Sequence, residues 1–560
     1  MPPALVIGNN KTTDMFLENS YDGEVQEILF PTDNTNWSRY EPIYQNQFYY
    51  PTVAVLNNSS FADLNAVDIN AIVTDAAGII VYQTQESVQI MLRKGDTVLN
   101  GTEPTFMDGG APIYDGTYFY TFEKPMSLPS SGQYTLTVTI DEGSGDPNLV
   151  NNTKEYTFTV LPSITGTITV PSASFPTIES VISQIYTQGV VDTLNVVISP
   201  GTYNIGSNTS DYALELMSGI SGFNTTEDLV RFIPSLEAEN IRGSIIINFR
   251  SASGIGMYIA SSLESSYEKA TVNKLRVSYF AGMMATDFYK FNGRITFDGG
   301  KYKAIRFRMA PNLPATANNR IPIFIGQGVD NITINNCIIE NQSIPNPVVP
   351  TLLYDAKFNS FVFDDVSEVS SGVLVRSVLP VDHNNINVNY LDTLVNNNIN
   401  ITNNHFYGGS YGIISLGIGP LYNIAKGYYV GYYNQSNNFS NNIITNQDIC
   451  GIFTGYEEAV RINNNHIYNL GETYQGSNDI AGIMLGGNRF DNTDTYPGTT
   501  GYNNINVTMD GNEIHHIYSN SDAYGIKAEQ VLNNFVYSQV RGDIYFTNHN
   551  DAIKYYNNVI

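Results

Sequence analysis

The sequence predicts an all-β protein, with an N-terminal immunoglobulin-like β-sandwich followed by a right-handed parallel β-helix that carries a capping helix. Three observations lead to this fold class: an asparagine repeat in the last third, a column of Gly-Ile pairs in step with it, and regularly spaced strand patterns in the first quarter. Repeats of 20–50 residues are typical of solenoids and propellers. Here the apolar residues alternate in short runs, so the repeating unit is a coil of strands.

Residues 21–161 have the pattern of the β-sandwich. Turn residues separate seven strand-like segments: Val53–Leu56, Val67–Val73, Ile79–Tyr82, Val88–Leu92, Tyr118–Phe122, Tyr134–Ile140 and Tyr156–Val160. Seven short strands in a segment of this length are typical of an immunoglobulin-like module. We expect residues 1–20 to be an N-terminal extension, in which Ala4–Ile7 has the pattern of a strand suited to donation to a neighbouring copy.

Residues 164–560 are assigned to the β-helix, after a short linker at Leu161–Ser163. Residues 176–188 place apolar side chains at helical spacing, and Pro176 and Glu179 suit a first helical turn. A single amphipathic helix before a solenoid is suited to cover the open apolar end of its first coil.

The clearest repeat is an asparagine inside the frame apolar-x-x-Asn-x-apolar. The column contains Asn404, Asn442, Asn465, Asn512, Asn534 and Asn558. The steps of 38, 23, 47, 22 and 24 residues fit a coil of about 23 residues, with 47 as a double step and 38 as one step plus an insertion. Asn336 extends the column in a shifted coil, because Thr333 replaces the apolar residue.

Two physical properties explain asparagine in such a column. Asparagine tolerates the left-handed backbone region, and its amide can bond the asparagines above and below it. A second column consists of the Gly-Ile pairs that begin at Gly412, Gly451, Gly482 and Gly525. Glycine there permits a sharp turn and close backbone approach.

Two family resemblances support these assignments. Residues 76–82, 131–136 and 145–153 resemble CARDB-type adhesion modules of bacterial extracellular proteins, which implies a spacer or adhesion role for about a quarter of the chain. The helix at 176–188, the strand Leu194–Ile198, the turn Pro200–Tyr203 and the asparagine coils resemble pectin-lyase-like right-handed β-helix proteins. The second resemblance implies the fold and leaves the activity open.

Composition limits the class of partner. The net charge is −26, with 53 acidic and 27 basic residues, which argues against nucleic acid because phosphate binding requires clustered cations. No apolar run is long enough for a transmembrane helix. Cys337 and Cys450 are too few for a disulfide framework and several coils apart, so we expect free thiols that face solvent or stack within a coil. Few charges and many Asn, Thr, Ser and Tyr residues favour an extracellular or cell-surface location.

Catalysis by a polysaccharide-degrading enzyme would require two carboxylates facing one cleft. Asp364 and Asp365, with Asp382 nearby in sequence, are the mid-chain candidates, and a solvated loop is the alternative. The resemblance to polygalacturonases would also require an Asn-Thr-Asp-Gly motif and a His-Gly motif, and both are absent. Glu457, Glu458 and Arg461 lie close together, which we interpret as a surface salt bridge rather than a calcium lyase site.

Metal binding has two sequence candidates. Asp141, Glu142 and Asp146 lie in an acidic loop suited to calcium, although without EF-hand spacing. His405 and His466 follow column asparagines, but Ile443 lies between them in the column, so we expect them on non-adjacent coils. In the pair 515–516 we expect one histidine to point inward and one outward.

Insertions between coils are the expected binding surface, because solenoid insertions gather on one face. The insertion at residues 423–436 is rich in tyrosine, and Tyr428, Tyr429, Tyr432 and Tyr433 are the candidates for stacking on sugar rings. The alternative is that these rings pack on the flank of the β-helix.

These observations favour a non-catalytic extracellular surface protein that adheres or self-assembles, as in a filament or surface layer, and binds glycans. Its partners would be copies of itself, other surface proteins or polysaccharide, with no cofactor except calcium. The sequence ends within a coil motif, so we expect either that the natural protein continues or that a partner covers that coil. The alternative function is a glycoside hydrolase or lyase on a β-helix scaffold, and a third is a phage-type tail spike, which would require a trimer.

Overall fold

The chain is all-β, and its architecture comes from a computed structural model. The structure describes residues 22–31, 43–45, 48–59, 64–91, 117–141, 148–217, 230–260, 291–315, 317–326, 328–345, 347, 349–355, 360–363, 368–377, 394–423, 428–486, 488–489, 504–528 and 553–556. The chain divides into two compact units near Ile164. The strand pairing in these units confirms the predicted β-sandwich and parallel β-helix.

The first unit contains two main sheets, and every strand pair in them except one is antiparallel. One has the order β1-β4-β7, with β1 Gly23–Phe30, β4 Thr52–Asn57 and β7 Thr117–Thr121. The other has the order β2-β10-β9-β5-β6, with β2 Ile43–Tyr44, β10 Thr153–Leu161, β9 Gly132–Asp141, β5 Leu64–Asp75 and β6 Ile80–Met91. A short ladder joins β3 Phe48–Tyr49 to β8 Met126–Ser127.

Alternation explains the packing of the sandwich. In β9 every second residue from Tyr134 to Ile140 is buried, which is the period-2 pattern of a strand with one face on the core. The segments predicted as two strands, 79–82 and 88–92, are one strand, β6, which pairs with β5 from Tyr82 to Met91. The polar residues between the two segments break the apolar pattern in the sequence, so the segments look separate. Hydrogen bonding to β5 nevertheless continues through these residues and makes one strand.

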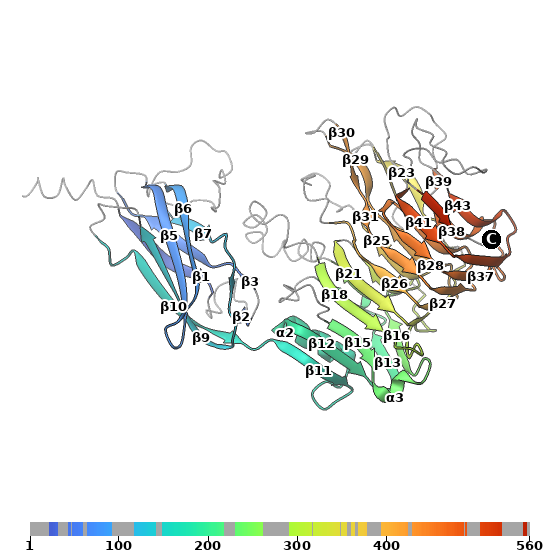
Figure 1. The fold of residues 1–560 in the computed structure, drawn as a ribbon, viewed down its shortest axis with the longest axis horizontal. Coiled ribbons are helices and arrows are strands. Elements are labelled where there is room, and N and C mark those ends of the chain that lie inside the picture. The colour runs from blue at the N-terminus through green and yellow to red at the C-terminus, as the bar shows by residue number, and fades with distance from the viewer. Residues whose placement is uncertain are drawn as a thin grey trace, which may run out of the picture. The chain divides into compact units, whose positions relative to one another are not determined.

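The second unit is a parallel β-helix with three long sheets (Figure 1). The first sheet contains β11 Ile164–Val170, β12 Val190–Ile198, β15 Val230–Pro234, β18 Phe291–Asp298, β21 Val329–Asn335, β26 Asn400–Thr402, β32 Asn438–Ser440, β36 Arg461–Asn463, β41 Val507–Asp510 and β44 Ile553–Tyr556. The second contains β13 Gly201–Gly206, β16 Ile245–Arg250, β19 Ile305–Met309, β22 Ile338–Glu340, β27 His405–Tyr407, β33 Ile443–Thr445, β37 His466–Leu470 and β42 Glu513–Ile517. The third contains β14 Tyr212–Met217, β17 Ile255–Ala260, β20 Ile321–Ile325, β25 Ser371–Arg376, β28 Tyr411–Leu416, β34 Cys450–Gly455, β38 Ile480–Leu485 and β43 Ala523–Ala528.

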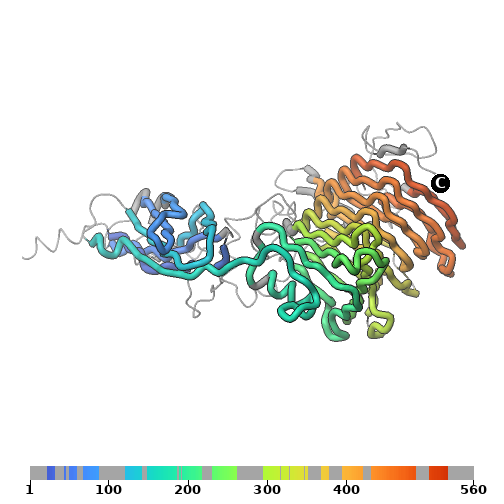
Figure 2. Tube along the Cα trace, turned by 60° about the horizontal axis from the view of Figure 1, so that its bottom comes forward, coloured from blue at the N-terminus to red at the C-terminus, as the bar shows by residue number. Residues whose placement is uncertain are grey.

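Each coil contributes one strand to each sheet, and Figure 2 shows successive coils stacked from green to red. The predicted helix is α2, Ile178–Gln188, which buries an apolar side that includes Ile178, Val181 and Ile185. Thr177 Oγ1 accepts a hydrogen bond from the Ser180 N–H at 3.1 Å, a capping contact that satisfies a free donor of the first turn. Neither α2 nor the one-turn α3, Leu236–Glu239, reaches the length or hydropathy of a bilayer-spanning segment.

A ladder of buried asparagine side chains joins the later coils. The Nδ2 of Asn404 donates to Oδ1 of Asn442, Asn442 to Asn465, and Asn465 to Asn512, at 3.3, 3.1 and 2.9 Å. Each Nδ2 also donates to a main-chain carbonyl of the preceding coil, and each Oδ1 accepts the main-chain N–H of the preceding asparagine. The amides are therefore satisfied in an interior where an unpaired polar group is costly.

The left-handed turn falls on the residue before each ladder asparagine. Asn403, Asn441 and Asn464 have φ of 56°, 59° and 53°, so the two roles predicted for one asparagine are divided between neighbours. Asn336 shares this left-handed conformation, with φ of 53°. The pairing of Ile338 with His405 places Cys337 opposite Asn404. The predicted column was therefore wrong by one residue there, and Cys337 occupies the ladder position.

The prediction for the step of 47 residues was also wrong. Asn465 bonds Asn512 directly, so this step is one coil with a long insertion and not a double step. The step of 38 is one coil plus an insertion, as predicted. Asn534 and Asn558 lie outside the described residues, but Tyr555 of the Asn558 frame pairs with Met509 of the Asn512 frame, as the frame predicts. The two strands are direct neighbours in the first sheet, so the separate coil predicted at Asn534 does not lie between them.

The Gly-Ile pairs form an aligned column in the third sheet, as expected. Ile413, Ile452, Ile483 and Ile526 are in register. A Cβ on Gly451 would lie 2.6 Å from the Gly482 carbonyl oxygen and 2.7 Å from Ile467 Cγ2. The glycine is required for close approach within a strand and not for a turn.

Insertions gather beside the coils, as solenoid architecture suggests. The hairpin of β23 Thr351–Asp355 and β24 Ser360–Phe363 forms a small sheet with β39 Asn488–Arg489, and β24 contacts the hairpin of β29 Gly419–Asn423 and β30 Tyr428–Tyr432. These strands lie near the top of Figure 1. A further ladder, β31 Asn434–Gln435, β35 Glu457–Glu458 and β40 Asn504–Ile505, follows one corner of the coil.

Replacing one ladder asparagine should weaken the solenoid. Asn442→Ala leaves the Asn404 N–H, the Ile401 carbonyl and Asn465 Oδ1 each without a partner that Asn442 supplied. We expect a loss of about 2–4 kcal/mol, since each unsatisfied buried group costs about 1–3 kcal/mol. Urea denaturation followed by circular dichroism measures it.

The matched control is Asn441→Gly at the adjacent left-handed residue. Glycine adopts that backbone region readily, so the change should stay within about 0.5 kcal/mol. Equal losses in the two variants would show that the ladder bonds do not hold the coils together.

Candidate functional site

The outer face of the second sheet carries two columns of reactive and charged side chains. Residues between the columns, such as Phe406, Ile444 and Ile467, are buried in the core, so their neighbours face outward. One column runs Arg306, Ile338, His405, Ile443, His466, Glu513, and the other Arg308, Glu340, Tyr407, Thr445, Tyr468, His515. In Figure 1, β13, β16, β27 and β37 mark this sheet.

The earlier part of this face holds a cationic cluster, consisting of Arg242, Lys303, Arg306 and His405. Arg242 lies in the turn after α3 and hydrogen-bonds Nδ1 of His405 through its guanidinium. Arg306 Nη1 forms a 3.1 Å ion pair with Glu340. Lys303, in a left-handed turn with φ of 56°, donates to the Asn403 main-chain carbonyl.

Burial and these charges keep His405 neutral. Burial, followed by Arg242, Lys303 and Arg306, lowers the pKa of His405 to about 4. Because the Nδ1 of a neutral ring accepts from Arg242, the proton resides on Nε2. This Nε2–H is buried and has no hydrogen-bond partner among the described residues.

The cluster therefore has an excess of donors and positive charge. Burial lowers the pKa of Lys303, and Arg306 Nε, like His405 Nε2, has no partner within the described part of the chain. Glu340 supplies one carboxylate, which Arg306 already pairs. Such a constellation is suited to an anionic group, because guanidinium donors match carboxylate and sulfate oxygens.

An aromatic side chain lies beside these donors. Tyr407 follows His405 by two residues on the same face of β27 and is 48% exposed. An exposed ring next to a charged cluster provides a flat apolar surface for a sugar.

The tyrosines predicted for sugar stacking are differently placed. Tyr432 and Tyr433 are only 3% and 6% exposed, so the prediction that they stack on sugar rings is wrong. They pack on the flank of the β-helix instead. Tyr433 contacts Tyr456 edge-on at 5.9 Å between centroids. The backbone of Tyr428 and Tyr429 lies in β30, while their side chains are outside the described structure.

The predicted carboxylate sites lie mostly outside the described residues. Asp364, Asp365 and Asp382 fall there, and so do Glu142 and Asp146. Asp141 is exposed at the end of β9. Calcium at the acidic loop therefore stays a prediction.

Among the histidines, Ile443 does separate His405 from His466, as expected. His466 instead lies beside a histidine that sequence spacing did not place there: its Nε2 is 2.8 Å from Nε2 of His515. The expectation that one residue of the pair 515–516 points inward is wrong, because His515 is half-buried and His516 exposed. Both cysteines are free and buried within the coils.

Glu457 is not part of a surface salt bridge, contrary to the sequence interpretation. It is fully buried and replaces an asparagine between Asn434 and Asn504. Its carboxyl accepts hydrogen bonds from Ser415, Asn434 and Asn437 at 2.5–2.9 Å. Burial raises the pKa of Glu457 to about 7, because the three hydrogen bonds, which lower the pKa, offset burial only in part.

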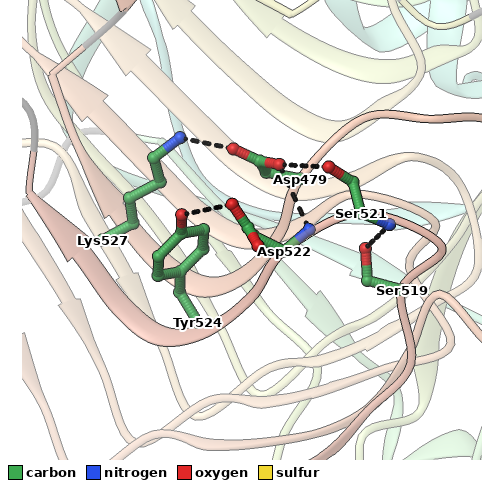
Figure 3. A network of polar contacts seen from close by, with 6 residues as sticks. All are labelled: Asp479, Ser519, Ser521, Asp522, Tyr524 and Lys527. Carbon is green, nitrogen blue, oxygen red and sulfur yellow. Dashed lines mark hydrogen bonds and ion pairs between the residues drawn. The ribbon is translucent and has the colours of Figure 1, made fainter.

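Figure 3 shows a polar network at the third sheet, in which Asp479 pairs with Lys527 at 2.8 Å and accepts from Ser521. Tyr524 donates to Asp522 in the same network. The hydrogen bond from Lys527 is the main cause that lowers the pKa of Asp479. A glycosidase acid requires a raised pKa, so this carboxylate is suited to joining the last coils and not to proton donation.

No protein-family model matches the chain, and no curated protein matches it. Solved structures that match include a CARDB domain from Pyrococcus furiosus in complex with di-metal ions, at 15% identity and a TM-score of 0.16, over 25% of this chain and 90% of that one. A family 28 exopolygalacturonase from Yersinia enterocolitica matches at 11% identity and a TM-score of 0.22, over 96% and 99%. A Pseudomonas phage tailspike protein matches at 8% identity and a TM-score of 0.18, over 91% and 60%.

Glu457 should give the chain a measurable pH dependence. A carboxyl with a raised folded pKa stabilises the fold at low pH, and this contribution is lost as the pH rises from 4.5 to about 7. Glu457→Gln cannot ionise, so the stability of the variant relative to the native chain should increase across that window. The increase should be on the order of 3 kcal/mol at most.

Thermal midpoints of both proteins at a series of pH values measure this difference. The comparison with the native chain is necessary because His405, with its lowered pKa, contributes in the opposite sense between pH 4 and 6.5. A difference that stays constant from pH 4.5 to 8 would show that Glu457 keeps one charge state throughout.

Proposed function

We propose that the chain is a non-catalytic extracellular surface protein that binds an anionic polysaccharide along the outer face of the second sheet. The observation that carries the proposal is the cationic cluster around a neutral histidine. Three cations and the unpaired Nε2–H of His405 converge there, in a chain whose net charge is −26.

The geometry of the solenoid supports a polymeric ligand. Strands of the second sheet repeat along the coil axis at about 4.8 Å, so their outward side chains form parallel rows. Arg242, Arg306 and Tyr407 come from three different coils of this sheet or its adjoining turns. A sugar chain lying along the coil axis would contact all three, with its carboxylate or sulfate groups near the guanidiniums and a ring on Tyr407.

An adhesive role is favoured over catalysis by the charges of the described residues. At the cationic cluster, Glu340 is held in an ion pair with Arg306. Asp298, whose charge acts on Lys303, accepts hydrogen bonds from Gly300 and Asn336. Retaining or inverting hydrolysis requires two carboxylates that face the substrate. The alternative, a polysaccharide-degrading enzyme, depends on Asp364, Asp365 and Asp382, which lie outside the described residues.

Binding of a polyuronate to the full chain tests the proposal. Arg306→Ala should weaken the affinity at least tenfold at low salt, because it removes a charged donor from the cluster. Glu340→Gln should strengthen binding, since it removes the competing carboxylate. Calorimetry at 50 mM and 300 mM salt should also show weaker binding at the higher concentration.

Arg461→Ala is the matched control, because it removes an exposed arginine from the first sheet. Equal binding of Arg306→Ala and the native chain, or equal affinity for neutral dextran, would contradict the proposal. Release of shortened oligosaccharides during the titration would instead support the enzymatic alternative.

A further inference from the structure

Three of the six histidines gather at the later end of the second sheet. His466 lies on β37, and His515 and His516 lie on β42 of the next coil. Glu513 is paired with His466 across the two strands. Ligand atoms of His466, Glu513 and His515 all lie within 4.8 Å of one another.

We propose that His466, Glu513 and His515 form a binding site for a transition-metal cation of the zinc class. Two imidazoles and one carboxylate are a common ligand set for such cations. The Nε2 atoms of His466 and His515 are 2.8 Å apart and face each other. Ligand atoms around one zinc ion lie roughly 3–4 Å apart, so a shift of about 1 Å in the exposed Glu513 completes the set.

Ring packing holds the two imidazoles in this orientation. Tyr468 stacks on His515 with centroids 5.3 Å apart and planes at 15°, and it contacts His466 at 4.6 Å. The rings therefore approach from neighbouring coils with restricted rotation. A preformed pair loses less conformational entropy when it binds an ion.

His516 supplies a second, independent argument for the metal site. Its φ is 55°, and it aligns with the left-handed residues Gly408, Asn446 and Asn469 of preceding coils. Its Nδ1 contacts Nδ1 of His515. When His515 uses Nε2 as a ligand, its Nδ1–H donates to His516, which is the usual support of a metal-bound histidine.

The site is separate from the cationic cluster. Ile443 lies between His405 and His466 in the column, and His515 Nε2 is 3.9 Å from the carboxylate of Glu513. A cation is disfavoured beside Arg242 and Lys303 but is attracted by the carboxylate at the later coils.

Zinc titration of the full chain, first stripped with a chelator, tests the site. Competition with a chromogenic chelator should give one Zn²⁺ per chain. His466→Gln and His515→Gln should each lose this site, and Glu513→Gln should weaken it at least tenfold. His516→Asn, which restores the residue found at 446 and 469, should weaken it about tenfold by removing the support of His515.

His405→Gln is the matched control and should bind zinc like the native chain, as should Arg306→Ala. These positions are on the outer face, so thermal midpoints without zinc should be similar in all variants. Zinc should raise the midpoints of the native chain and of both controls. The site would be overturned if the native chain did not bind zinc, or if His466→Gln and His515→Gln bound it as tightly as the native chain. Either result would establish a plain hydrogen-bonded histidine pair. Neither result bears on polyuronate binding.

Discussion

The asparagine ladder is the constraint on which the later coils depend. The Nδ2 of Asn404, Asn442 and Asn465 each bonds both the next coil and a carbonyl of the preceding coil. The Oδ1 of each asparagine that follows accepts from a main-chain N–H. Such a network is stabilising only when it is complete, because each missing partner leaves a buried polar group unsatisfied. The ladder therefore fixes the register of each coil on the one before it, and the outer strands inherit that register.

Register explains which parts of the fold the sequence predicted. The packing of each coil on the next requires asparagine and Gly-Ile at the same point of successive coils. Both patterns therefore recur in the sequence, and both predict the β-helix. The error at Asn336 has a physical reason: two adjacent positions both accept asparagine, one for its left-handed backbone and one for its buried amide. Cys337 fills the second position because its thiol is small enough for the interior and donates to the Asn335 carbonyl at 3.1 Å.

The functional surface was harder to predict, since it consists of contacts between coils whose sequence separation varies with the insertions. His466 and His515 are 49 residues apart, and interpretation of the 47-residue step as two coils placed them on different levels. Arg242 and His405 are 163 residues apart, and no local pattern joins them. Composition alone marks the tyrosine-rich insertion, and composition does not separate Tyr432 and Tyr433, which are buried on the coil, from an exposed ring such as Tyr407.

The two histidine environments show how one scaffold position acquires different chemistry. His405 and His466 occupy the same column of the second sheet, with one coil between them. Around His405 the neighbours are Arg242, Lys303 and Arg306, which favour the neutral ring and repel cations. Beside His466 the next coil supplies Glu513 and a second imidazole, which attract a cation. Because both rings occupy the same position in their coils, the residues contributed by adjacent coils decide whether the surroundings of the histidine favour an anion or a cation.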